Sequence, residues 1–263
     1  MSQAERAGNA DLTIRAKSVM AMCYSMNGRF LEADRVLAGA TDTLHMSRAT
    51  QAAYYAAQHR QNRECRSQSE PGAERDRFRA CEEYYARRAL ETTGDISKRF
   101  YFAYLVAVDE GDYDRAAAAC DSALACAPPA SHDYARAAFY RSETERFRGD
   151  EAARFEWLVH AAMADVQGAV RDYGALGGVA EELLRRGDAA RAMRCIRVAI
   201  NDTQAYNSPI RSWRDMAILP QIEQAYSERN ARLRAMYVAL ILLAFLFALS
   251  AIGGVPVSYT HLR

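Results

Sequence analysis

The sequence predicts an all-α protein in which a stack of helical hairpins precedes one membrane-spanning helix. Residues 97–130 contain an apolar helix, a turn at Gly111 and an alanine-rich second helix that ends at a proline pair. Gly111, Gly149 and Gly187 follow one another at steps of 38 residues, as expected when a hairpin unit is repeated along a chain. Residues 235–255 form an apolar run without a charged residue, which supplies the spanning helix.

The composition favours helix and excludes a strong electrostatic partner. Half of the 263 residues are hydrophobic, enough for a sizeable core in one or two domains. Alanine is abundant, and alanine has the highest helix propensity. The formal net charge is only +1, so no overall field attracts nucleic acid or an acidic surface.

Motifs that carry catalysis or bind metal are missing from the sequence. The six cysteines include no CxxC pair, and the five histidines include no HxxH or HExxH. The paired carboxylates at 82–83 and 181–182 are adjacent, so on a helix they point about 100° apart rather than toward one another. The sequence therefore predicts no enzyme activity, no catalytic residue, no metal site and no cofactor in this chain.

The first hairpin is predicted between residue 12 and residue 40. An apolar pattern begins at Leu12 and continues to the turn Asn27–Gly28, after which residues 30–40 form a second helix. The preceding residues 1–17 contain no apolar core segment, so we expect no secretory signal peptide there.

The next stretch, residues 50–93, is less regular. Helices are expected over 52–65 and 75–90, separated by the breaker Glu70–Gly72. Arginines are frequent from residue 60 to residue 88, but acidic residues are interleaved with them at helical spacings. We therefore interpret these arginines as solvated helix faces rather than a phosphate-binding patch.

Two more hairpins follow the central one. In the first, 131–147 pairs with 150–165, and in the second, 175–186 pairs with 189–202. Each hairpin exposes an apolar face that only a neighbouring hairpin can cover, so stacking buries one continuous core. The predicted solenoid domain occupies residues 1–206 and contains about five hairpins.

A juxtamembrane helix, residues 207–234, is expected to begin at Ser208, which suits an N-cap. Pro220 is expected to kink this helix or to start a new one. The transmembrane helix is predicted at 235–255, because a helix of this length at about 1.5 Å per residue matches a hydrocarbon layer about 30 Å thick. The alternative is a soluble protein whose apolar tail packs internally.

The residues on either side of the span bear on its orientation. Arg229, Arg232 and Arg234 precede it and Arg263 follows it, so the positive-inside rule places the hairpins in the cytoplasm. The last residues, 256–263, are expected to be a non-native tail that does not continue the helix. Within this tail, residues 257–263 have the sequence VSYTHLR, which resembles the translated read-through of a sequencing adapter and predicts that the chain is a fragment of a longer protein.

The central hairpin resembles a tetratricopeptide (TPR) repeat, a helix–turn–helix unit of about 34 residues. The resemblance lies in the spacing of its turn and small residues, which are Gly111, Ala116, Ala123, Leu124 and Pro128. Cys120 occupies a position where the second TPR helix usually places a core aromatic. We therefore expect Cys120 to be a buried thiol that acts as a small hydrophobic residue.

The segment before the span resembles a family of bacterial single-pass regulators, in which TPR-like repeats, one membrane helix, a coiled-coil linker and a helix-turn-helix DNA-binding region follow one another. The matching residues are Arg214, Ile218, Leu219, Pro220, Ile222, Ala225, Tyr226, Arg232 and Leu233. This resemblance implies a bacterial inner-membrane protein with extracytoplasmic repeats, whereas the charge rule gives the opposite orientation. The sequence has no signal peptide and no DNA-binding region after the span, so no residue here is assigned to nucleic acid.

These features predict a membrane-anchored TPR-like sensor or regulatory module, the N-terminal part of a transcriptional regulator. It would bind a peptide or protein partner and relay binding through the membrane helix. In TPR proteins the first helix of each repeat lines the concave face, and that register selects Tyr101, Leu105, Asp109, Arg136, Glu143, Arg146, Glu181 and Arg185. These could instead be ordinary solvent-facing residues. The alternative function is a membrane-tethered TPR scaffold for the assembly of envelope or secretion components.

Overall fold

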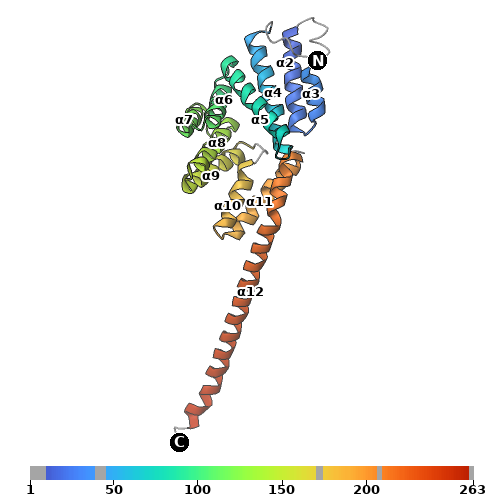
Figure 1. The fold of residues 1–263 in the computed structure, drawn as a ribbon. Helices are drawn as coiled ribbons and strands as arrows, with labels where there is room; N and C mark the ends of the chain where they lie inside the picture. The colour runs from blue at the N-terminus through green and yellow to red at the C-terminus, as the bar shows by residue number, and fades with distance from the viewer. Residues whose placement is uncertain (1–9, 39–45, 170–173, 206–208, 261–263) are drawn as a thin grey trace.

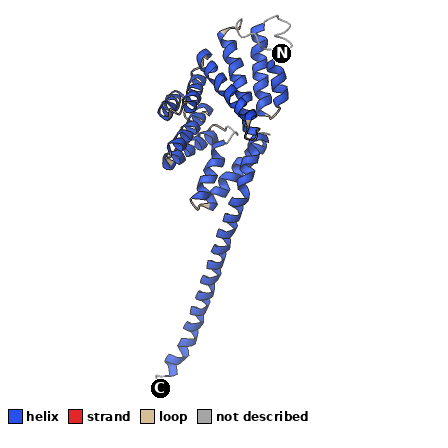
Figure 2. Cartoon of the chain, in the orientation of Figure 1, coloured by secondary structure: helices blue, strands red, loops and turns tan. Residues whose placement is uncertain are grey.

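The computed structural model describes residues 10–38, 46–169, 174–205 and 209–260, and within these ranges all regular secondary structure is helical (Figure 2). The all-α prediction is therefore confirmed. In chain order the helices are α2 (Ala10–Met26), α3 (Phe30–Ala38), α4 (Arg48–Gln68), α5 (Ala73–Thr92), α6 (Ile96–Asp109), α7 (Tyr113–Cys126), α8 (His132–Arg148), α9 (Glu151–Gln167), α10 (Gly174–Arg185), α11 (Ala189–Ala205) and α12 (Pro209–Thr260).

The helices before α12 pair into successive hairpins. The pairs are α2–α3, α4–α5, α6–α7, α8–α9 and α10–α11, and each hairpin packs against the next one in the chain (Figure 1). This arrangement confirms the predicted TPR-like solenoid. Residues 39–40 of the predicted N-terminal hairpin lie outside the described residues, as do residues 1–9, which precede it.

Three of the hairpin turns share a Gly–Asp sequence, at residues 111–112, 149–150 and 187–188. The glycine of each turn has a φ of 72–78°, a left-handed conformation that glycine adopts without steric penalty. The aspartate N–H donates a hydrogen bond of 2.8–3.0 Å to the carbonyl five residues earlier. Its carboxylate then accepts one of 2.9–3.0 Å from the backbone N–H three residues later, which caps the next helix. The 38-residue step is thus a repeat of one turn structure.

The hydrophobic core contains many buried side chains at both ends of the stack and few in the middle. An N-terminal core, with Tyr54 and Phe102 among its members, joins α2 to α6, and a C-terminal core that includes Leu158 and Ile196 joins α8 to α12. Between them, the α6–α7 hairpin buries a small cluster composed mainly of small side chains. Cys120 belongs to this cluster and is 3% exposed, which confirms the expected buried thiol.

The last helix, α12, is continuous from Pro209 to Thr260. It continues through Pro220, so no new helix starts there, because the loss of one backbone hydrogen bond leaves the rest of the ladder intact. The expectation that the last residues do not continue the helix is wrong for 257–260, which belong to α12. Near its beginning α12 packs against α11, and Ile222 is completely buried in the C-terminal core.

The remainder of α12 leaves the hairpins and carries the apolar segment (Figure 1). Within the described ranges one helical segment, Met216–Ala251, is long and apolar enough to cross a membrane. Its large apolar side chains from Met236 to Leu249 are 50–76% exposed and point to all sides of the helix. The alternative of an apolar tail packed inside a soluble protein is therefore wrong.

Candidate ligand-binding site

A cavity of about 250 Å³ lies between the α6–α7 hairpin and α8. Aromatic side chains of α6 and α8 form one wall, and small side chains of α7 and α8 leave the space open. Its lining includes Phe100, Tyr101, Tyr104, Cys120, Ala123, Arg136, Ala137 and Tyr140. The cavity thus lies where the core is smallest. An aromatic side chain at position 120 of a TPR unit would fill this space, but Cys120 is too small to do so.

The aromatic wall is held from behind by α4. The Arg63 guanidinium donates a hydrogen bond of 2.8 Å to the Tyr101 hydroxyl and one of 3.4 Å to the Tyr140 hydroxyl. The two tyrosine rings lie 5.4 Å apart, and the His59 ring meets that of Tyr101 edge-on at 5.9 Å. Burial raises the pKa of Tyr101, so it remains a neutral phenol. Its orientation is therefore fixed before any ligand arrives.

The polar rim of the cavity is formed by Arg136. Its guanidinium donates a hydrogen bond of 2.7 Å to the Ser97 hydroxyl and forms an ion pair of 2.7 Å with Asp133. It also lies 5.6 Å from the centre of the Tyr101 ring, within the range of a cation–π contact. Arg136 is half-buried, and a guanidinium has five N–H donors. Its remaining N–H groups can therefore donate hydrogen bonds to a ligand carboxylate at the mouth of the apolar cavity.

Two of the predicted concave-face residues, Tyr101 and Arg136, meet in this cavity. Leu105, one turn further along α6, packs against the N-terminal core and the small middle cluster. Asp109 is the last residue of α6. Burial and the negative charges of Glu83 and Glu82 raise the pKa of Asp109 to about 6.

The other predicted residues lie outside the cavity. On α8, Arg146 forms an ion pair of 2.9 Å with Glu143, one turn earlier. On α10, Glu181 is exposed, and Arg185 donates two hydrogen bonds of 2.7 and 2.8 Å to the buried Glu182. These four residues therefore belong to two separate parts of the hairpin stack.

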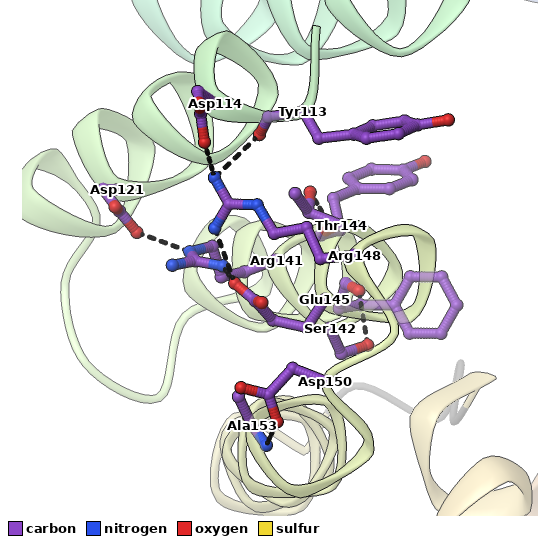
Figure 3. A network of polar contacts seen from close by, with 12 residues as sticks. Tyr113, Asp114, Asp121, Arg141, Ser142, Thr144, Glu145, Arg148, Asp150 and Ala153 are labelled. Carbon is purple, nitrogen blue, oxygen red and sulfur yellow. Dashed lines mark hydrogen bonds and ion pairs between the residues drawn. The ribbon is translucent and has the colours of Figure 1, made fainter. Parts of the chain in front are cut away.

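An ion-pair network fixes α8 to α7 and thereby fixes two walls of the cavity (Figure 3). At its centre, Glu145 is 5% exposed and accepts hydrogen bonds from Arg141 and Arg148 of its own helix. Arg141 also pairs with Asp121 of α7 at 2.9 Å, and Arg148 with Asp114 of α7 at 2.5 Å. A buried carboxylate with two guanidinium partners is fully compensated. The network thus sets the distance between the two helices.

The lining of this cavity is suited to packing and charge pairing with a ligand. Burial raises the pKa of Cys120 to about 12, so this thiol is not a nucleophile at neutral pH. Within the described ranges, no group of three or more histidine, cysteine, aspartate or glutamate side chains is placed to hold a metal ion. The lining instead offers aromatic faces for packing and one guanidinium for a negative charge.

Sequence reasoning missed Arg63 and Tyr140. Arg63 lies in the arginine-rich stretch that we interpreted as solvated helix faces, but its guanidinium is enclosed by two tyrosines from other hairpins. The acidic neighbours of that stretch also pair across helices, as Arg66 of α4 does with Glu82 of α5 at 2.6 Å. A pattern within one helix does not show which arginine a distant hairpin will cover.

Comparison with known protein families identifies a match. A family model described as the SusR N-terminal TPR domain matches residues 1–216, which include all five hairpins and the beginning of α12. No curated protein and no solved structure matches the chain.

Proposed function

Because this chain belongs to the SusR N-terminal TPR domain family, we propose that it is a membrane-anchored sensor module that binds a peptide or protein partner and relays binding through α12. Stacked helical repeats form extended concave surfaces that bind such partners. The family describes an N-terminal domain, which supports a role as the sensing part of a transcriptional regulator. The proposed boundaries are residues 1–206 for the hairpins, 207–234 for the juxtamembrane segment and 235–255 for the span.

The proposed partner places one bulky apolar side chain in the cavity between α6, α7 and α8. A volume of about 250 Å³ is below the roughly 300–1,000 Å³ of sites that enclose a drug-sized molecule, which favours a single anchoring side chain. A carboxylate beside that anchor would bind Arg136. The rest of the peptide would run along the proposed concave face, where Glu143, Arg146, Glu181 and Arg185 offer charges of both signs.

The observation that carries the relay is the continuity of α12. Ile222 is fixed in the core of the last hairpin, and the same helix continues without interruption to the exposed apolar side chains beyond Met236. A flexible linker would absorb a movement of the hairpins, whereas a helix transmits it. Binding that shifts the last hairpin would therefore displace the spanning segment.

The binding part is tested by peptide selection. The full chain in lipid nanodiscs would be used to select from a displayed random peptide library. We expect enrichment of peptides with an aromatic or branched anchor next to a carboxylate, and loss of their binding in Tyr101→Ala and in Arg136→Gln. Enriched peptides that bind both variants as tightly as the unaltered chain would contradict the proposed site.

The relay is tested with a short Gly-Ser insertion after Tyr226. A selected peptide should change hydrogen exchange in α12 beyond residue 226 in the unaltered chain. The insertion variant should bind the same peptide with the same affinity but lose the exchange change beyond the insertion. If that change persists, the relay is refuted, and a tethered scaffold that binds without signalling becomes the better description.

The orientation is tested with the native thiols. Cys23 and Cys126 are exposed and not in disulfides. We propose that the hairpins are extracytoplasmic at a bacterial inner membrane, so a membrane-impermeant maleimide should label these residues in intact spheroplasts. Labelling only after lysis would place the hairpins in the cytoplasm, as the arginines before the span predict.

A further inference from the structure

A second cavity, of about 310 Å³, lies where the turn between α10 and α11 meets α12. It belongs neither to the proposed peptide site nor to the spanning segment. It is lined by Leu184 of α10, Gly187 of the turn and Ala189 of α11, and by Ala225, Glu228, Arg229, Arg232 and Leu233 of α12. The cavity is therefore a notch between the last hairpin and the helix that leads away from it.

The charge of this notch is positive and partly uncompensated. Arg232 is 80% exposed and lies 3.8 Å from Glu228, a loose pair. Arg229 has no ion-pair partner among the residues that the structure describes. The hydrogen bonds from Arg191 lower the pKa of Asp188, and the positive charge of Arg229 lowers it further. Asp188 already forms an ion pair of 2.6 Å with Arg191 and caps α11. Two guanidinium groups therefore face the notch with donors to spare.

The position of the notch along α12 corresponds to a membrane surface. Arg229 and Arg232 precede Met236, where the dense run of exposed apolar side chains up to Leu249 begins, by seven and four residues. At about 1.5 Å per residue they lie roughly 10 and 6 Å from it along the helix. The polar headgroup layer adds roughly 5–8 Å to each side of the hydrocarbon core. When α12 spans a membrane, Arg232 therefore lies within the headgroup layer and Arg229 lies at its water-facing edge.

We infer that this notch binds the phosphate group of an anionic membrane lipid. The inference rests on the proposed insertion of α12 in a membrane. Guanidinium groups bind phosphate oxygens through paired N–H donors, and Leu184 and Leu233 provide an apolar edge for the beginning of the acyl chains. A lipid bound here contacts both α12 and the turn of α10–α11, so it fixes the last hairpin against the bilayer.

The test compares the full chain in phosphatidylcholine nanodiscs with and without phosphatidylglycerol. We expect phosphatidylglycerol to slow hydrogen exchange of the turn amides at 187–189 about five-fold, the effect of a ligand at a few times its Kd on a locally opening segment. The double variant Arg229→Gln/Arg232→Gln should lose this protection. Arg234→Gln is the matched control, because Arg234 lies at the same membrane edge but does not line the notch.

Three outcomes would overturn the inference. Absence of added protection in phosphatidylglycerol would show that the notch does not bind the lipid. An equal loss of protection in Arg234→Gln would show that basic residues are attracted to the membrane surface in general. Equal protection by inorganic phosphate in phosphatidylcholine nanodiscs would make a free anion the ligand.

Flotation with phosphatidylcholine vesicles separates this inference from the proposed function. A chain that does not float refutes membrane insertion itself. A chain that floats but gains no protection from phosphatidylglycerol refutes only the lipid site.

Discussion

The Arg63 guanidinium donates a 2.8 Å hydrogen bond to the Tyr101 hydroxyl, although the two residues lie 38 positions apart in the chain. This contact joins the N-terminal core to the wall of the candidate ligand cavity. It also explains why Tyr101 is well placed to bind: its ring faces the cavity while its hydroxyl is already satisfied from behind. A ligand in the cavity can therefore use the ring without disturbing a free polar group.

Tyr101→Phe should lower the free energy of unfolding by about 1–3 kcal/mol, because Arg63 loses its shorter hydrogen bond in a partly buried position. Urea unfolding of the full chain in detergent measures the change. Tyr84→Phe, at an exposed position of α5, should alter the free energy by less than about 0.5 kcal/mol. Equal values for the two variants would show that the Arg63–Tyr101 contact carries no stability.

Glu145→Gln should destabilise the protein by about 3 kcal/mol, because it leaves Arg141 and Arg148 without their shared buried carboxylate. The matched control is Glu143→Gln on the same helix. Its partner Arg146 has a side chain that is 44% exposed, so this change should cost less than about 1 kcal/mol. Thermal unfolding of the two variants side by side provides the comparison, and a loss of the same size in both would contradict the central role of Glu145.

His59 should make stability depend on pH. Burial and the nearby charge of Arg63 hold the pKa of His59 well below 6.5, and its Nε2 is 3.8 Å from Glu82 without a hydrogen bond. Below pH 6.5 the unfolded chain therefore binds a proton that the folded chain does not. The contribution of neutral His59 to the free energy of unfolding is complete above pH 6.5. It is lost on acidification by about 1.4 kcal/mol per pH unit.

The measurement for His59 is the free energy of unfolding at pH 7 and pH 5.5. From pH 7 to pH 5.5 the free energy of unfolding of the His59→Gln variant should fall by about 1 kcal/mol less than that of the unaltered chain. Parallel slopes for the two proteins would show that His59 is protonated in the folded state.

Asp109 should change stability with pH in the direction opposite to His59, so that its contribution falls as the pH rises. Its folded pKa of about 6 lies above the ordinary value, so the folded chain binds more protons between pH 4 and pH 6. The stability that protonated Asp109 contributes is complete near pH 4 and is lost as the pH rises through 6. Asp109→Asn should thus stabilise the protein at pH 7, by about 1 kcal/mol after allowance for solvent screening. Chemical unfolding should show no gain at pH 4; a gain of equal size at both pH values would exclude titration as the cause.

Ile222→Ala should loosen α12 from the last hairpin. Removal of a fully buried isoleucine side chain costs about 2–5 kcal/mol. Hydrogen exchange should accelerate between residues 216 and 226 but remain unchanged in the N-terminal core. Glu223→Ala, at the adjacent exposed position, is the control, and exchange that is equally fast in both variants would show that α12 is not held through Ile222.

The hairpins could be predicted from the sequence because their determinants are local. A glycine with positive φ and an aspartate cap act within a few residues, so Gly111, Gly149 and Gly187 mark the turns. The breaker before α5 acts in the same local way, since helix α4 ends at Gln68. Pro220 shows the limit of local rules, because the packing of Ile222 favours a helix that continues past it.

The cavity could be predicted only in part. The TPR register selected Tyr101 and Arg136, and both residues line it. The empty volume itself results from small side chains on α7 and α8 that face one another after folding, and no periodicity within one helix reveals such a pairing. Arg63 was missed for the same reason, since its burial depends on Tyr101 and Tyr140 from later hairpins.

The length of α12 makes it a lever arm. The fulcrum is Ile222, and Leu249 lies 27 residues further along the same helix, about 40 Å at the usual helical rise. A tilt of only about 5° at the fulcrum would swing Leu249 sideways by roughly 3.5 Å relative to the hairpins. Small adjustments in the C-terminal core are therefore magnified geometrically at the far end of the apolar segment.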